Sequence, residues 1–110
     1  MKKVKLMFDF GEGPIWNEYF DEKSLKTTTG IDEIDNNKEI QKLNQELQDI
    51  YSSYYEQDSH DMPMWFNKEK QIKDKEEVLK KLSLLKEMIY SATNHQVEIE
   101  DEASKEYEEL

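Results

Sequence analysis

The sequence contains no cysteine, which excludes disulfide bonds, a thiolate nucleophile and any metal site built on thiolates. It also has no apolar run near the roughly 20 residues that a membrane-spanning helix needs. The opening stretch MKKVKLMFDF carries a basic pair, but Lys5 and Asp9 interrupt its apolar residues, so the pattern is not that of a signal peptide. These absences predict a cytoplasmic protein that makes no contact with a membrane.

Glycine and proline are scarce as well, with three and two copies in 110 residues. Charged residues make up 37% of the chain and apolar residues only 35%, a balance that leans towards disorder. The apolar residues are nevertheless periodic, and there are twelve aromatics (two Trp, six Tyr and four Phe). We therefore expect one folded domain over residues 1–110 with a modest core, and an acidic tail at 101–110 that frays or forms a weak last helix.

Acidic residues outnumber basic ones by 26 to 15, which gives a formal net charge of -11. This charge opposes direct binding to nucleic acid or to anionic lipid. It would attract a basic protein and accelerate the encounter, and nucleases are common basic partners. The plain alternative is that the charge serves solubility alone.

Alternating apolar residues open the chain, with Val4, Leu6, Phe8 and Phe10 at every second position. Period two predicts a half-buried strand over residues 3–10. The turn that follows, residues 11–14, contains two glycines and a proline, and Trp16 is expected to fold back onto the sheet. A second alternating segment, residues 96–100, is the expected partner of the opening strand, which cannot satisfy its backbone alone.

Two amphipathic helices are predicted, over residues 36–57 and 67–94, because apolar residues recur there every three or four positions. Asn36 with Glu39 resembles a capping pair, and Asn67 is the expected cap of the second helix. The charged start of the second helix should project into water, while Ile72 and Leu84 are assigned to its apolar stripe. Residues 17–35 are expected to form a loose connection with a short strand or helical turn.

The predicted fold is therefore a small α+β domain. An antiparallel helix pair packs on a short sheet of two or three strands, with strands at 3–10 and 96–100.

No catalytic residue, cofactor or metal site stands out from the pattern. Asp58, His60 and Asp61 could hold a divalent metal, but three polar residues in a loop are expected without any ligand. The glycine-rich turn at 11–14 carries Glu12 and a proline, so it does not suit a phosphate. We predict a protein that is not an enzyme.

Acids and aromatics are the features that remain for binding a protein. The aromatics Tyr51, Tyr54, Tyr55, Trp65 and Phe66 surround the connection between the helices, and core packing is expected for most of them. The residues predicted to bind a partner are Asp32, Glu33, Asp35, Tyr54, Tyr55, Asp58, Asp61, Glu98, Glu100, Asp101 and Glu102.

The opening segment ends in a D-[FY]-G-x-x-P-[LI]-W pattern, which is matched by Asp9, Phe10, Gly11, Pro14, Ile15 and Trp16. A helix with spaced leucines and a late strand follow. In these respects the chain resembles a group of short bacterial proteins that are encoded beside polymorphic or contact-dependent growth inhibition toxins and are thought to confer immunity. The resemblance implies a protein that neutralises a cognate toxin domain by stoichiometric binding. The acidic net charge points to a basic nuclease as that toxin, and we expect the free protein to be a monomer.

Two alternatives follow from other features of the sequence. A phage-type acidic inhibitor that mimics DNA would use the same net charge and would present regularly spaced acids on one face. A small metal-dependent hydrolase would use Asp58, His60 and Asp61 as ligands.

Overall fold

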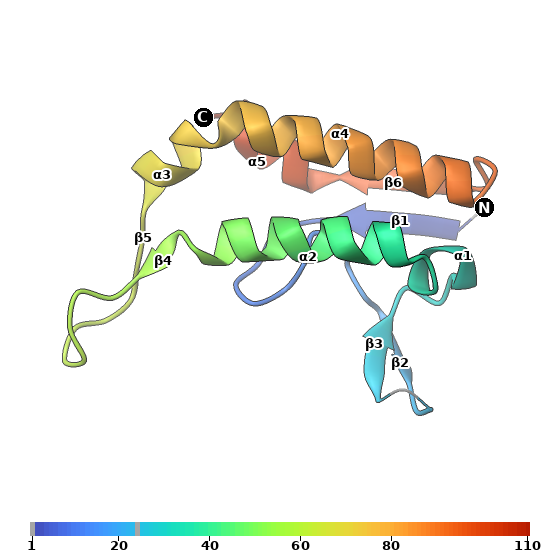
Figure 1. Cartoon of the computed structure of the whole chain (residues 1–110), viewed down its shortest axis with the longest axis horizontal. Coiled ribbons are helices and arrows are strands. Elements are labelled where there is room, and N and C mark those ends of the chain that lie inside the picture. Colours follow the sequence, from blue (N-terminus) through green and yellow to red (C-terminus); the bar gives the residue numbers. More distant parts are fainter. Residues whose placement is uncertain (1, 24) are drawn as a thin grey trace.

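The computed structural model describes residues 2–23 and 25–110 and has the predicted α+β architecture (Figure 1). Its elements in chain order are β1 (Lys2–Leu6), β2 (Tyr19–Asp21), β3 (Lys26–Thr28), α1 (Asp32–Asp35), α2 (Lys38–Ser52), β4 (Tyr55–Glu56), β5 (Trp65–Phe66), α3 (Lys68–Lys73), α4 (Lys75–Ala92), β6 (Val97–Asp101) and α5 (Glu102–Glu108). Helices α2 and α4 run antiparallel, side by side, and the β1–β6 pair packs against them (Figure 1).

The two predicted strands do pair with each other, and the pairing is parallel. Val4, Leu6 and Val97 are buried on the face that meets the helices. On the other face, register places Lys3 beside Glu98 and Lys5 beside Glu100. Parallel pairing is possible because four helices (α1 to α4) and two hairpins intervene and carry the chain back to the start of the sheet.

The opening strand is shorter than predicted and ends at Leu6 rather than residue 10. The chain then folds back on itself, since the Met7 amide donates to the Pro14 carbonyl at 2.8 Å and the Trp16 amide donates to the Lys5 carbonyl at 2.8 Å. Phe8 is still buried, but Phe10 lies half exposed on the turn. The expected return of Trp16 to the sheet is confirmed, with the Lys5 ammonium 5.9 Å from its ring centre.

A stripe of polar side chains on α2 holds this turn in place. The Asn44 side chain accepts from the Ile15 amide at 2.9 Å, and the Gln48 side chain donates to the Gly11 carbonyl at 2.9 Å. Ser52 accepts from the Gly11 amide at 3.1 Å. These three helical residues are four apart, so they lie on one face of α2. The glycine- and proline-containing turn is therefore held by the fold itself.

Helix α2 begins and ends inside the predicted range. Its cap is Asn37 rather than Asn36, and the Asn37 side chain accepts from the amides of Glu39 and Ile40. The helix ends at Ser52 because the next residues enter β4, which pairs antiparallel with β5.

The second predicted helix is broken in two at Asp74, between α3 and α4 (Figure 1). Asn67 caps α3 as predicted. In α3 Gln71 is buried, while Ile72 is about half exposed, because the break changes which side of the helix faces inward. In α4 the buried stripe is Val78, Leu82, Leu85 and Ile89, and Leu84 lies beside it and is about half exposed. The assignment of Ile72 and Leu84 to the apolar stripe was therefore wrong.

The acidic tail does not fray but forms helix α5. Ala103 and Tyr107 are buried, and the Asp101 carboxylate caps the helix by accepting from the Ser104 amide at 2.8 Å. Of the two outcomes expected for this tail, fraying or a last helix, the structure has the helix, because two apolar side chains four residues apart dock on the core. Residues 17–35, expected to form a loose connection with a short strand or helical turn, contain the β2–β3 hairpin and helix α1.

Candidate partner-binding surface

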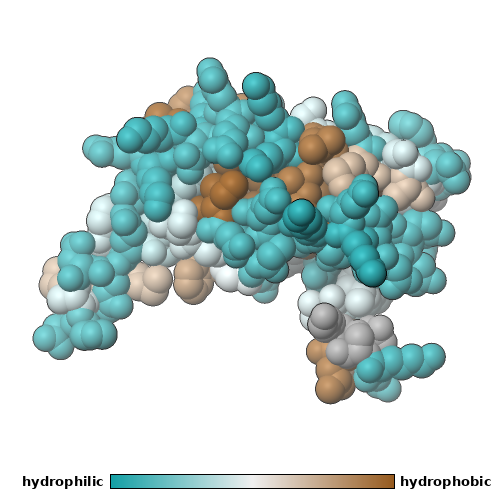
Figure 2. All heavy atoms as spheres, in the orientation of Figure 1, coloured by the Kyte–Doolittle hydropathy of each residue, from teal (hydrophilic) through white to brown (hydrophobic). Residues whose placement is uncertain are grey.

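Exposed apolar side chains gather on two hairpins. In the described part of the chain, the large apolar residues that are exposed are Phe10, Tyr19, Phe20, Leu25, Met62, Met64, Trp65, Ile72 and Leu84. Six of these nine belong to the β2–β3 hairpin or to the β4–β5 hairpin. Figure 2 shows both hairpins projecting from the same side of the molecule, near its two ends, as two arms separated by open space. We name them the 19–28 arm and the 55–66 arm.

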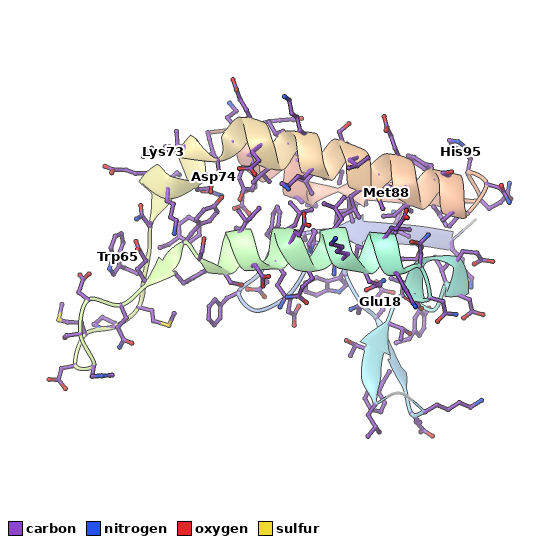
Figure 3. All side chains as sticks on the ribbon, viewed as in Figure 1. Glu18, Trp65, Lys73, Asp74, Met88 and His95 are labelled. Atoms are coloured by element: carbon purple, nitrogen blue, oxygen red, sulfur yellow. The ribbon has the colours of Figure 1, made fainter. Side chains whose placement is uncertain are left out.

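The 55–66 arm combines apolar and acidic side chains. Its short ladder pairs Tyr55 with Phe66, and its far end carries Met62 and Met64, both about half exposed. Trp65 points away from the body (Figure 3). Asp58 and Asp61, predicted to bind a partner, are exposed on the same arm. Apolar anchors flanked by carboxylates are suited to a basic protein surface.

The 19–28 arm was missed by the sequence reasoning. Tyr19 and Phe20 are about 60% exposed, and Leu25 is 76% exposed. Leu25 has a left-handed backbone with φ of 57°, a conformation that costs a non-glycine residue about 1 kcal/mol. The signal available for this hairpin was a pair of aromatics, Tyr19 and Phe20, and a run of three threonines, Thr27 to Thr29, on either side of a polar stretch.

An aromatic cluster anchors the 55–66 arm to the body. Tyr51 stacks on Phe8 with ring centres 4.7 Å apart, and Phe66 lies 5.2 Å from Tyr55. Tyr55 in turn contacts the exposed Phe10 at 4.9 Å. Aromatic packing therefore runs without a gap from the buried core to the surface beside the arm.

Tyr54 was predicted to bind a partner, and the structure corrects this, because its side chain is fully buried. Its hydroxyl donates to the Asp74 carboxylate at 3.0 Å and accepts from the Tyr107 hydroxyl at 3.1 Å. Burial raises the pKa of Tyr54, and the bonds to Tyr107 and Asp74 raise it further. Tyr54 thus joins α5 to the start of α4 and belongs to the core.

The three predicted acids on α1 have different surroundings. Asp32 and Glu33 are exposed on α1. Asp35 is partly buried, and its carboxylate accepts from the Thr29 amide and hydroxyl and from the Gly30 amide. Asp35 therefore fixes the chain at the base of the 19–28 arm, a structural role that the sequence reasoning did not foresee.

The predicted acids near the end of the chain also differ in exposure and in their partners. Glu98 and Glu100 are exposed on β6, beside the lysines of β1. Asp101 caps α5 and pairs with Lys86 at 2.7 Å. Burial alone would raise the pKa of Asp101, but hydrogen bonds from Lys86 and Ser104 lower it overall. Glu102 is partly buried and lies 3.5 Å from Lys105.

The structure therefore does not bring the predicted partner-binding residues together. Tyr55, Asp58 and Asp61 lie on the 55–66 arm, and Asp32 and Glu33 lie at the opposite end of α2 (Figure 1). Glu98, Glu100, Asp101 and Glu102 form a third group along β6 and the start of α5.

Asp58, His60 and Asp61 do not assemble as a metal site in the described residues, where no group of three His, Cys, Asp or Glu side chains converges. Within the same residues, no helix combines the length and apolarity that would let it cross a membrane.

Comparison with models of protein families, with curated proteins and with solved structures found no match to this chain.

Proposed function

We propose that this protein is a stoichiometric inhibitor that binds a cognate toxin domain, a basic nuclease, in the cytoplasm and so confers immunity. The observation that carries the proposal is the concentration of exposed apolar side chains on two arms of an otherwise highly charged chain. Exposed apolar groups cost solubility, and contiguous ones mark interaction surfaces.

Charge supports the same proposal. The net charge of -11 favours a basic partner and opposes nucleic acid. Asp58 and Asp61 place carboxylates beside Met62 and Met64, so that one arm carries both a steering charge and an apolar anchor. The resemblance of residues 9–16 to immunity proteins points to the same class of partner, although the structure assigns those residues to holding a turn.

The DNA-mimic alternative has weaker support. A DNA mimic requires regularly spaced acids on one face, whereas the predicted partner-binding acids lie in three separate groups. Two of these acids, Glu98 and Glu100 on β6, also have a lysine of β1 beside them.

The direct test is co-expression with the C-terminal domain of the protein encoded immediately upstream. If that domain stops growth and this chain restores it, immunity is established, and degraded RNA or DNA in the arrested cells names the toxin's substrate. A harmless neighbour, or a toxic one that this chain does not neutralise, would contradict the proposal.

Arm variants then test the surface. Met64→Ser with Trp65→Ser, and separately Leu25→Gly, should weaken binding by about tenfold or more, since central apolar anchors dominate interface energies. The matched controls are Ile72→Ser and Leu84→Ser, which remove similarly exposed side chains outside the arms. Equal effects in both sets would place the interface elsewhere.

Leu25→Gly should change the free energy of unfolding by less than about 0.5 kcal/mol, because relief of backbone strain offsets the added entropy of the unfolded chain.

A further inference from the structure

A hollow at the base of the 55–66 arm has a lining unlike the rest of the surface. It lies where the end of α2, the β4–β5 ladder, α3 and α5 meet, and it has a volume of about 430 Å³. Its lining includes three aromatic rings, two carboxylates and one lysine, from Tyr51, Tyr55, Phe66, Glu106, Glu109 and Lys68.

The three rings are neighbours of one another. Their centres are 6.0 Å apart for Tyr51 and Tyr55, 5.2 Å for Tyr55 and Phe66, and 5.8 Å for Tyr51 and Phe66. All three pairs are tilted or edge-on rather than stacked. Tyr51 is buried and Phe8 is stacked on it, whereas Tyr55 and Phe66 are only partly buried. A cation in the hollow would therefore approach Tyr55 and Phe66, since aromatic π-electron density attracts a cation within about 6 Å of a ring centre.

Carboxylates supply the negative charge of the hollow. Glu106 is positioned by the buried Gln71, whose side-chain amide donates to it at 2.6 Å. The pKa of Tyr51 is raised first by burial and then by the charge of Glu106, which agrees with a carboxylate beside that ring. Glu109 is exposed at the rim.

Lys68 is the basic residue of this lining. Among the described residues it makes no ion pair with either glutamate and no side-chain hydrogen bond. Glu106 accepts from Gln71, but among the described residues neither glutamate is neutralised by an ion pair, so both retain a negative charge that can attract a cation from outside.

The chemistry of the lining selects the class of ligand. Anions are disfavoured by the two carboxylates. A hard metal ion requires several oxygen ligands, whereas aromatic rings make up much of this lining. An organic cation gains from both components, because its flat or alkylated surface packs on the rings while its charge faces the carboxylates.

We propose that this hollow is a receptor for the guanidinium or ammonium group of an arginine or lysine side chain on a partner protein. This receptor goes beyond the proposed function, because the hollow should bind a small organic cation in the absence of any toxin. It would also place one basic side chain of a partner directly beside the apolar 55–66 arm.

The test is an NMR titration of the full chain with N-acetyl-arginine amide at constant ionic strength. The neutral isostere N-acetyl-citrulline amide is the control. We expect saturable shifts in the millimolar range at Tyr55, Phe66 and Gln71 with the arginine compound and none with citrulline. Equal shifts with citrulline, or no saturation, would overturn the proposal. Tighter binding of tetramethylammonium would also overturn it, by assigning the hollow to a free quaternary amine.

Two charge-neutralising variants give opposite expectations. Glu106→Gln keeps an acceptor for Gln71 but removes the charge, and should weaken the arginine compound by about fivefold. Lys68→Gln removes a competing cation and should tighten binding by about twofold. Urea unfolding shows whether each variant is folded. If the toxin of the immunity test still binds the Glu106→Gln chain normally, this receptor is contradicted while the proposed function stands.

Discussion

At the scale of single residues, the turn at 9–16 is governed by close contact with α2. A Cβ added at Gly13 would overlap the Asn44 side chain, with Cγ and Oδ1 only 2.6 Å away. The same side chain accepts from the Ile15 amide, so it cannot move aside without leaving that amide unpaired. Glycine is required here for space rather than for its backbone conformation.

Gly13→Ala should therefore destabilise the protein by about 1–3 kcal/mol, the usual cost of overpacking. Asn44→Ala should cost about 1–2 kcal/mol through the unpaired Ile15 amide. The double variant should cost clearly less than the two single costs combined, because the clash disappears with the Asn44 side chain. Urea unfolding of the four proteins measures this coupling. Strict additivity would show that the overlap is relieved in some other way.

Tyrosines in the core make stability depend on alkaline pH. Burial, and secondarily the charge of Glu106, raises the pKa of Tyr107 to about 12 from 10.0. The folded state then keeps a proton that the unfolded chain releases, so this stabilisation is fully present below pH 10 and is lost as pH rises towards about 12.

Tyr107→Phe should remove this part of the pH dependence. Lysines also titrate above pH 10, so the informative quantity is the difference between the variant and the parent chain. Between pH 8 and 11.5 the urea midpoint of the variant should fall less steeply than that of the parent chain. At neutral pH the variant should be less stable, because it lacks the hydrogen bond from Tyr107 to Tyr54. Parallel curves would mean that Tyr107 ionises equally easily in both states.

At the scale of elements, α5 is the segment whose folding depends on its ends. Seven residues are too few for an isolated helix to be stable in water. The helix is stabilised instead by the burial of Ala103 and Tyr107 in the core and by the Asp101 cap. Asp101 also ties α5 to α4 through its ion pair with Lys86.

Asp101→Ala should cost about 1–2 kcal/mol, since it removes the cap and the ion pair together. Asp101→Asn keeps a capping oxygen and should cost less than about 1 kcal/mol. Because the pKa of Asp101 is lowered, its stabilisation is present above the unfolded value of 3.8 and is lost as pH falls through the folded value. Acid unfolding of the three chains checks this, and equal losses for Ala and Asn would rule out a capping role.

At the scale of the whole molecule, net charge and local charge differ. The chain carries -11 overall, yet on the exposed face of the sheet Glu98 and Glu100 have Lys3 and Lys5 beside them. Asp58 and Asp61 on the 55–66 arm make no ion pair with any described residue. A basic partner should therefore be steered towards the arm more than towards the sheet.

Asp58→Asn with Asp61→Asn should slow association with a basic toxin domain and reduce its salt dependence. Glu98→Gln with Glu100→Gln changes the net charge by the same amount and serves as the matched control. Stopped-flow association at several salt concentrations should show a decrease of about three- to tenfold for the arm pair and a smaller one for the sheet pair. A larger effect of the sheet pair would move the encounter surface to β6.

Much of the framework could be predicted from sequence because it depends on local spacing. The alternation of Val4 and Leu6 identifies a strand with one buried face, and the spacing of Leu43 and Leu47 identifies a helix with one buried stripe. Composition likewise determined the absence of disulfides and the acidic net charge. These properties need only neighbouring residues or simple counts.

Only the tertiary structure decided which aromatic and acidic residues are available to a partner. Tyr54 and Tyr107 are 53 positions apart, yet both are buried and hydrogen-bonded to each other. Tyr54 was expected to bind a partner, and the tail that contains Tyr107 was expected either to fray or to form a last helix. Tyr19, Phe20 and Leu25 remain outside because the core is filled by other residues. Such outcomes depend on competition among distant side chains for one interior, which local periodicity does not record.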